Sequence, residues 1–445
     1  MKTTPRILCF LISLLFASVS QAATILAGPV ITHLSAREAR IWIQWEEAPQ
    51  NAVIRYSNQA EPDKTFESSI QVGDFGISDT SLDRVNPGRT YVYSVEADGE
   101  TLVEELFTAP FHYKDIQQPP SFSVAIIGNN YVIEEGAEPP YQVLGGNHDV
   151  FPRLEGQNLS GVIWAGSTSF LRDMDVSSMG GILRRHGVNR AQPATRKLFA
   201  NVWHKAVPGL GNFSAEHSIP SYAPDVWARA GFSQYWPSAS NFHLKPHAET
   251  PLYHSFRWAD TEFFFLDTYS ERQGYAERAI VPRLFSEEQQ AWLLRALSRS
   301  DAAFKVIVSG TAMLVPADNP GNFTYADQHK DPFMRLLERN RLSGLVFISG
   351  GKHFGEITKF VRPRGYSLYE MSVGSTTYLD PNNPSESNFF REPRAYSEAP
   401  QYGQLSVSGE EGSRVLTLSL RETSGALIIE HVITQDDVAW KESAF

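Results

Sequence analysis

The pattern of apolar and polar positions changes once along the chain. From residue 23 to residue 113, short stretches alternate between apolar and polar side chains, as at residues 40–45, 52–56 and 90–95, and turns rich in Gly, Pro and Asn separate them. Short alternating strands at this spacing are typical of a β-sandwich of fibronectin type III or immunoglobulin-like kind. No catalytic constellation stands out in this part, so we expect it to serve packing or spacing.

From residue 122 onward, continuous apolar runs alternate with amphipathic segments. Such runs predict parallel strands that are buried on both faces. They occupy residues 122–128, 161–166, 304–310 and 345–348. Three of these runs lead directly into polar residues, and open α/β sheets bind ligands at the carboxyl ends of their strands. The sequence therefore predicts one pocket, built where these strands end.

Two helices have clear local signals. Ser286 opens a capping box, which predicts a helix with an apolar side at Trp292, Leu293 and Leu297. The pair at residues 331–332 predicts a second helix, with Asp331 as N-cap and Pro332 in its first turn.

Strand signals also occur between and after these helices. Residues 255–267 resemble a hairpin that turns at residues 259–260. Further strands are expected at residues 366–373, 404–407 and 414–420.

Residues 1–22 have the pattern of a cleaved secretory signal peptide. Lys2 and Arg6 precede an apolar stretch at residues 7–19, and residues 20–22 fit a small-residue cleavage site. We therefore expect a periplasmic or extracellular protein without a stable membrane anchor.

Charge and cysteine content limit the kinds of partner that this protein can bind. The formal net charge is −11, and no basic runs interrupt the acidic balance, which argues against nucleic acid and anionic membranes. A small anionic or phosphorylated ligand in a locally positive pocket remains compatible with this charge. Cys9 is the only cysteine and lies within the predicted signal, so the exported chain would have no disulfide and no thiolate ligand.

The expected organisation has four parts. They are a signal peptide at residues 1–22, a β-sandwich at 23–113, a linker at 114–121 and a larger domain at 122–445.

Several short motifs, in their order and spacing, resemble the alkaline phosphatase D (PhoD-like) metallophosphatase family. They lie at residues 28–29, 40–43, 87–93, 235–237, 255–258, 264–267, 288–293, 304–310 and 402–405. The resemblance implies an α/β (α+β) fold, in which a fibronectin-like front domain precedes a four-layered, calcineurin-like phosphoesterase sandwich. It also implies metal-dependent hydrolysis of phosphomonoesters or phosphodiesters.

The positions where the family holds its metals are largely substituted here. That chemistry uses carboxylate and imidazole ligands to hold two metal ions. The family's Gly-Ser-Cys turn reads Gly128-Asn129-Asn130, and its Gly-Asp-Asn reads Gly166-Ser167-Thr168.

Two further motifs depart from the family in the same way. The aspartate-rich loop aligns with residues 203–212, which puts His204 and Lys205 where aspartates belong and Gly211 where an asparagine ligand belongs. The Gly-Asp-Val-His motif keeps only its histidine, as Lys352-His353.

One other motif carries possible ligands. His148 and Asp149 match the Asn-His motif of metallophosphoesterases, but they precede the second core strand. We interpret them as following a helix end with residues 145–146 as C-cap, and a relocated ligand pair is the alternative.

Three functions stay open on these residues. The first is hydrolysis with an atypical set of Ca, Fe, Mn or Zn ligands (His148, Asp149, His204 and His353), in which His353 or His204 could also act as general acid. The second is metal-free binding of an oxyanion or phosphoester by Asn129, Asn130, Ser167, Thr168, Lys205 and Lys352, with the lysines replacing the charge of the metals. The third is an extracellular interaction protein with a vestigial pocket.

Overall fold

A computed structural model describes residues 22–115, 118–134, 136–137, 144–213, 226–238, 251–273, 281–319, 321–362, 364–378 and 386–442. The predicted signal peptide lies almost wholly outside these residues, as does the middle of the predicted linker. No helix of the described residues is long and apolar enough to cross a bilayer.

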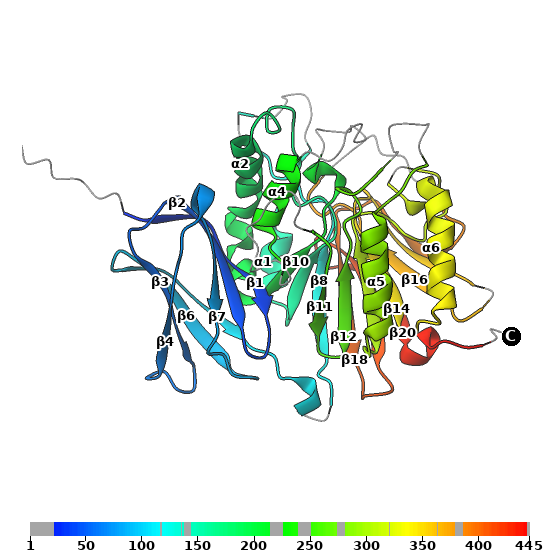
Figure 1. The fold of residues 1–445 in the computed structure, drawn as a ribbon, viewed down its shortest axis with the longest axis horizontal. Coiled ribbons are helices and arrows are strands. Elements are labelled where there is room, and N and C mark those ends of the chain that lie inside the picture. Colours follow the sequence, from blue (N-terminus) through cyan, green and yellow to red (C-terminus); the bar gives the residue numbers. More distant parts are fainter. Residues whose placement is uncertain are drawn as a thin grey trace, which may run out of the picture.

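Two large sheets face each other across the core (Figure 1). The nine-stranded sheet has the order β20 (Leu427–Thr434), β19 (Val415–Glu422), β18 (Gln401–Ser408), β8 (Phe122–Ile127), β9 (Gly161–Trp164), β10 (Trp203–Ala206), β1 (Thr24–Leu34), β2 (Ala39–Glu47) and β5 (Ile77–Leu82). The seven-stranded sheet has the order β11 (His254–Trp258), β12 (Thr261–Phe265), β13 (Phe304–Ser309), β14 (Leu345–Ser349), β16 (Leu368–Ser372), β15 (Gly355–Phe360) and β17 (Arg391–Ser397).

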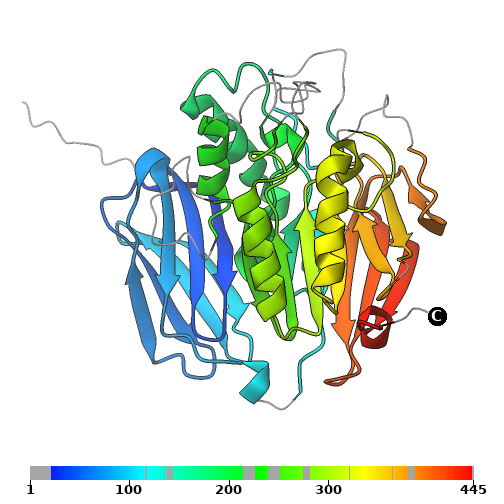
Figure 2. The ribbon, with the colours of Figure 1, turned by 45° about the vertical axis from the view of Figure 1, so that its right-hand side comes forward.

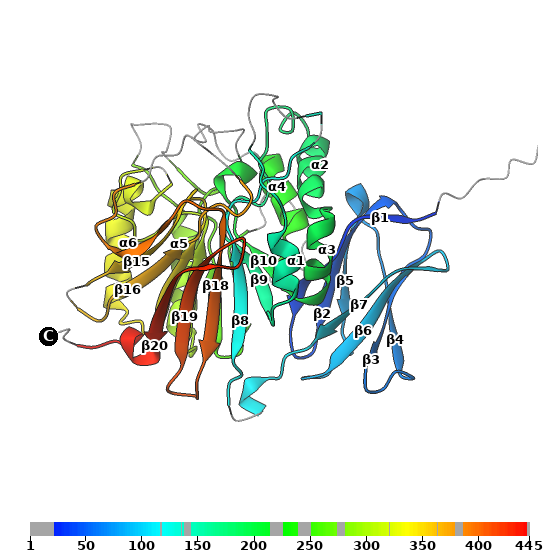
Figure 3. The same cartoon turned by 180° about the vertical axis from the view of Figure 1, so that it is seen from behind.

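Helices cover the outer face of each large sheet. Those on the nine-stranded sheet are α1 (Val150–Glu155), α2 (Met179–Arg190), α3 (Arg196–Asn201) and α4 (Val226–Tyr235). The seven-stranded sheet is covered by α5 (Glu287–Arg299) and α6 (Asp327–Arg339), which lie in front of it in Figure 2. Seen from behind, β8 lies between β9 and the strands of the tail (Figure 3). The predicted fold class, a calcineurin-like α/β sandwich behind a fibronectin-like β-sandwich, is confirmed.

The front β-sandwich shares a sheet with the larger domain. Its second sheet consists of β4 (Thr65–Ser69), β3 (Ala52–Asn58), β6 (Thr90–Ala97) and β7 (Glu100–Thr108). Its first sheet is β1, β2 and β5, and β1 pairs in parallel with β10 through Ile31 and Trp203. The Tyr93 hydroxyl also donates to the carbonyl of Ala200 in α3 over 2.9 Å, in a buried position. The front sandwich is therefore joined to the α/β part by backbone pairing as well as by packing.

Most predicted elements are present. Ser286 caps α5 through a hydrogen bond from the Gln289 amide, and the hairpin turns at Ala259, whose φ is 51°. β8, β9, β13 and β14 are parallel strands with almost wholly buried side chains, as their apolar runs predict.

The predicted start of α6 is wrong. The helix begins at Asp327, so Pro332 lies inside it rather than in its first turn. His329 explains the earlier start, because its ring packs against Phe285 and Phe323 and its Nδ1 accepts a hydrogen bond from the Leu284 amide. These tertiary contacts fix the first turn despite the proline.

The predicted helix C-cap at residues 145–146 is also wrong. Gly145 forms an isolated β-bridge with Tyr378, and the Gly146 amide donates to the carbonyl of Thr377. Residues 148–149 instead precede α1, with Asp149 at the N-cap position but without a side-chain capping bond.

Candidate functional site

The carboxyl ends of β8, β9 and β14 meet, although they belong to two different sheets. Asn129, just beyond β8, donates from Nδ2 to the carbonyl of Lys352, just beyond β14, over 3.2 Å. Its Oδ1 accepts from the Ser167 amide, beyond β9, over 2.9 Å. The fold therefore brings the ends of β8, β9 and β14 together, as the sequence predicts.

These ends form a packed network rather than an open pocket. We call the side chains of Asn129, Asn130, Ser167, Thr168 and Asn212 the polar knot. Each of these five residues is at most 4% exposed. Their polar atoms form hydrogen bonds with one another and with the surrounding backbone. Most donors and acceptors at these strand ends therefore already have partners within the protein.

Asn212 is the centre of the polar knot. Its Oδ1 accepts from the amides of Gly209 (2.9 Å) and Thr168 (3.4 Å). Its Nδ2 lies within hydrogen-bond distance of Thr168 Oγ1 (3.0 Å) and of Ser169 Oγ (3.1 Å) and carbonyl oxygen (3.2 Å). Ser167 Oγ adds a bond by accepting from the Gly211 amide over 2.9 Å.

Glycines let the backbones of the two sheets touch beneath the polar knot. A Cβ on Gly350 would lie 2.5 Å from the nitrogen of Gly166, and one on Gly128 would overlap the carbonyl of Gly374. Contacts this close exclude any side chain. Backbone therefore fills the space between the strand ends.

Aromatic rings pack in the segments that follow the same strands. Tyr131 and Phe170 follow the polar knot in sequence, and both rings pack on Tyr378, at 5.7 and 4.5 Å between centroids. Thr377 connects these rings to the polar knot, since its hydroxyl lies 3.0 Å from Asn130 Oδ1 and 2.7 Å from the Tyr131 amide.

Lys352 is held by carboxylates of its own surroundings. Its Nζ lies 3.0 Å from Glu356 Oε1 and 3.3 Å from Glu386 Oε2, and 4.8 Å from the centre of the Phe354 ring. Burial alone would raise the pKa of Glu356, but Lys352, Arg391 and a hydrogen bond from Asn388 outweigh it, and the net pKa is lowered. This arrangement is an internal ion-pair cluster.

His204 and Lys205 project to opposite faces of the nine-stranded sheet, as neighbours on a strand must. His204 lies on the helix side, where the Trp164 indole donates to its Nδ1 and its Nε2 contacts the Leu198 carbonyl over 3.1 Å. Burial lowers the pKa of His204 to about 3. Both of its nitrogens thus have partners, and the ring is neutral.

Lys205 lies between the two sheets. Its Nζ has no hydrogen-bond partner among the described residues and is 5.3 Å from the centre of the Phe256 ring. Burial lowers the pKa of Lys205 to about 7. The structure therefore does not bring Lys205 and Lys352 into one site.

The remaining predicted residues are His353, which lies against the aromatic rings beside the polar knot, and His148 and Asp149, which precede α1. His353 packs on Tyr378 with 5.0 Å between ring centroids, and His148 stacks on Phe151, while Asp149 is exposed before α1. Burial lowers the pKa of His148. Within the described parts of the chain, no three His, Cys, Asp or Glu side chains are placed to share a metal ion.

Sequence reasoning missed the residue that organises the site. Asn212 ends the aligned loop, one position beyond Gly211, where the family's asparagine was expected. A one-residue shift of that alignment would have found it.

Comparison with solved structures decides the fold. PhoD superposes with a TM-score of 0.70 over 95% of this chain and 91% of its own, at 12% sequence identity. This chain has a PhoD-like metallophosphatase fold. Purple acid phosphatase PPD1 from seeds of yellow lupin (Lupinus luteus) gives a TM-score of 0.60 at 13% identity, covering 93% of this chain and 74% of its own. No family model matches the sequence, and neither does any curated protein.

The described strand ends of this PhoD-like fold do not fit a pair of metal ions. Divalent metals at such a site need carboxylate and imidazole donors, whereas the polar knot offers amides and hydroxyls that already have hydrogen-bond partners within the protein. Lys352, whose carbonyl accepts from Asn129, is neutralised by its own carboxylates. We therefore derive no reaction step through metal at this position.

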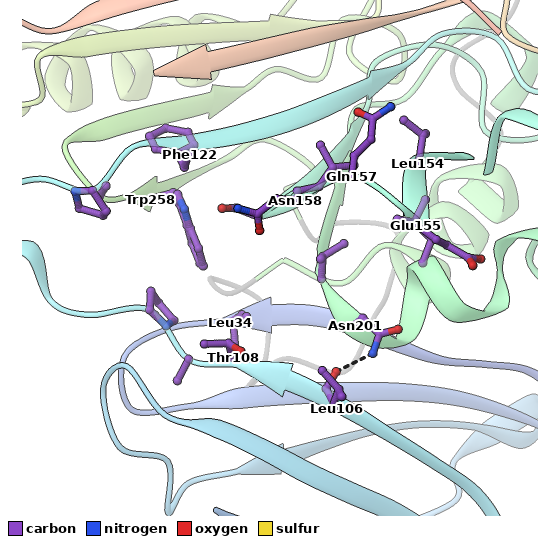
Figure 4. Close-up of a pocket in the computed structure, with 18 of the residues that line it drawn as sticks. Leu34, Leu106, Thr108, Phe122, Leu154, Glu155, Gln157, Asn158, Asn201 and Trp258 are labelled. Atoms are coloured by element: carbon purple, nitrogen blue, oxygen red, sulfur yellow. Dashed lines mark hydrogen bonds between the residues drawn. The ribbon is translucent and has the colours of Figure 1, made fainter. Parts of the chain in front are cut away.

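An open pocket lies elsewhere, at the seam between the front sandwich and the α/β part (Figure 4). It has a volume of about 590 Å³, within the usual range for ligand pockets. Leu34 and Thr108 come from the front sandwich, and Phe122, Asn158 and Trp258 from the α/β part. Its walls are mostly apolar, and the Asn158 side chain makes no hydrogen bond within the described residues.

Proposed function

We propose that this protein is an exported, non-hydrolytic binding protein on a phosphoesterase-like scaffold. Export rests on the signal pattern of residues 1–22. The absence of hydrolysis rests on one observation: where three strand ends meet, the side chains of the polar knot are hydrogen-bonded to the adjoining backbone and, between Asn212 and Thr168, to each other. An in-line attack on phosphorus needs a bound phosphate and an activated water, and among the described residues these bonds occupy the polar groups at the strand ends that would hold them.

The seam pocket is the proposed ligand site. Pockets at domain interfaces with apolar walls and a few polar groups are the usual form of small-molecule sites. Phe122 and Trp258 offer apolar surface, and the free amide of Asn158 can donate and accept. These features fit a small amphipathic molecule with an apolar ring or chain and one hydrogen-bonding group.

Hydrolysis is tested with p-nitrophenyl phosphate and bis(p-nitrophenyl) phosphate after reconstitution with Ca, Fe, Mn or Zn. We expect no turnover above that of the free metals. Metal-dependent turnover that is abolished by His353→Ala would contradict the proposal and restore the atypical-metal hypothesis.

Binding is tested with N-phenyl-1-naphthylamine, a neutral apolar probe whose fluorescence rises in a nonpolar site. We expect saturable binding to the wild type and at least a tenfold weaker affinity for Thr108→Trp, because the indole would fill the pocket. Thr101→Trp is the matched control, since Thr101 is also an exposed threonine of β7 but does not line the pocket. Equal affinity in all three proteins would exclude the seam pocket as the site.

A further inference from the structure

The seam pocket carries more negative than positive charge. The charged residues among those that line it are Glu105, Glu155 and Lys197. Lys197 is exposed, whereas both glutamates are partly buried. Water and salt screen the charge of an exposed lysine more strongly than that of a partly buried carboxylate. The two carboxylates therefore dominate the electrostatic potential inside the pocket.

Glu105 lies where β7 meets α3. Its Oε2 accepts a hydrogen bond over 3.3 Å from Nδ2 of Asn201, the last residue of α3, and this amide also donates to the Leu106 carbonyl over 2.7 Å. Burial raises the pKa of Glu105; the hydrogen bond from Asn201 and the charge of Lys197 oppose this shift, and the charge of Glu155 adds to it. Within the described residues, Glu105 is thus a partly desolvated carboxylate whose hydrogen-bond partner is a neutral amide.

The carboxylates and the aromatic rings lie on different sides of the pocket. Figure 4 shows Phe122 and Trp258 together on one side and Asn201 and Glu155 on the other. Glu105 belongs to the second side, because it is hydrogen-bonded to Asn201. One side of the pocket is therefore apolar and the other is negative.

We propose that the ligand of the seam pocket is an amphiphilic cation, in which an apolar ring or chain carries an ammonium group that lies beside Glu105 and Glu155. The inference rests on the proposed binding function and adds the charge of the ligand to it. An ammonium in this position forms charge-assisted hydrogen bonds with a carboxylate that burial has partly deprived of water. The charge is opposite to that of the small anionic ligand expected from the sequence.

Competition between ligands of different charge tests this inference. Octylammonium, octanol and octanoate share one chain length and differ in charge at neutral pH, and each is used to displace bound N-phenyl-1-naphthylamine at low ionic strength. We expect octylammonium to displace the probe at a concentration about fivefold lower than octanol does, which is the most that a partly exposed ion pair usually contributes. Octanoate should be the weakest of the three, because the carboxylates repel it.

Substitution of the glutamates assigns the preference to this side of the pocket. Glu105→Gln keeps an acceptor for Asn201 but removes the charge, and octylammonium should then bind no better than octanol. Glu104→Gln is the matched control, since Glu104 is the neighbouring, exposed glutamate of β7 and does not line the pocket, and it should retain the preference. Glu155→Gln should reduce the preference and provides a second variant in case Glu105→Gln folds poorly.

The outcomes separate this inference from the binding function on which it rests. Equal displacement by all three ligands in the wild type would show that Lys197 and water neutralise the carboxylates, and the inference would be wrong while the seam pocket remained a binding site. A preference for octylammonium that persists in both Glu105→Gln and Glu155→Gln would also overturn it. Failure of the probe itself to bind in the pocket would contradict both proposals.

Discussion

At the scale of single residues, the polar knot occupies the strand ends at which the resemblance to PhoD-like proteins implies metal ligands. Substituting one ligand would leave buried donors and acceptors without partners, which is expensive. Here Asn129, Ser167, Thr168 and Asn212 instead form hydrogen bonds with the adjoining backbone and, between Asn212 and Thr168, with each other. The site is therefore a structural element, and its residues should show their effects in stability.

Asn212→Ala tests this structural role. The substitution removes the side chain that bonds to Gly209, Thr168 and Ser169, and we expect the free energy of unfolding to fall by about 3 to 5 kcal/mol. Asn147→Ala is the control, because Asn147 is exposed, and it should stay within about 0.5 kcal/mol of the wild type. Chemical denaturation measures both, and equal effects would argue against the polar knot.

Lys205 should give the stability curve a distinct pH dependence. Its pKa is about 7 in the folded protein and 10.5 in the unfolded chain, so the unfolded chain binds more protons between these values. The free energy of unfolding contributed by this group therefore rises with pH from about 7 to 10.5. Below pH 7 the buried charge is present in full and destabilises the folded state.

Lys205→Met should remove this dependence. We expect the variant to be more stable than the wild type by about 3 to 5 kcal/mol below pH 7. The difference should shrink steadily as the pH rises toward 10. Urea denaturation across this pH range measures it, and a difference that stays constant with pH would show that Lys205 is not charged and buried.

At the scale of elements, the sequence was most informative where a signal is local. The capping box at Ser286 and the apolar runs of β8, β9, β13 and β14 depend on neighbouring residues and were predicted correctly. The start of α6 depends on the ring of His329 packing against Phe285 and Phe323, and no local sequence pattern shows these contacts.

Pro332→Ala should stabilise the protein. Pro332 lies inside α6, where it lacks the amide that would bond to the carbonyl four residues earlier. Restoring that bond outweighs the entropy gained by the unfolded chain, and we expect the free energy of unfolding to rise by about 1 to 2 kcal/mol. Denaturation measures the change, and a destabilised variant would mean that the proline is required for the helix start.

Substituting Lys352 tests whether this residue stabilises the fold or binds a ligand. Lys352→Met would leave Glu356 and Glu386 with less compensation, and we expect a loss of about 3 kcal/mol in the free energy of unfolding. Arg341→Met breaks the exposed pair with Glu442 and should change stability by less than about 1 kcal/mol. Phosphate-dependent stabilisation of the wild type that is lost in Lys352→Met would instead revive the oxyanion hypothesis.

At the scale of the whole molecule, the sequence predicted the two parts of the architecture but not the sheet that runs through both of them. Two patterns of periodicity and the PhoD-like motifs indicated a β-sandwich followed by an α/β sandwich. They could not show that β1 pairs with β10, since a single parallel pair between distant segments leaves no periodic signal. The sequence likewise could not predict the packed network at the strand ends, because this network depends on Asn212 and on close backbone contacts between two sheets.

Because the nine-stranded sheet contains strands of both parts, we expect the front sandwich and the α/β part to unfold together. Hydrogen bonds from Tyr93 to Ala200 and from Tyr235 to Gln44 reinforce this coupling. Differential scanning calorimetry should give one transition with equal calorimetric and van't Hoff enthalpies. Two separated transitions would show that the front sandwich is an independent unit.

The most direct test of the sealed mouth is a crystal structure of protein purified without chelator and soaked in manganese, with anomalous data collected at the manganese edge. We predict no anomalous peak among Asn129, Ser167, Gly350 and Asn212, and the hydrogen bonds of the polar knot intact. Two manganese ions bound between these strand ends, with the polar knot opened to ligate them, would contradict the account.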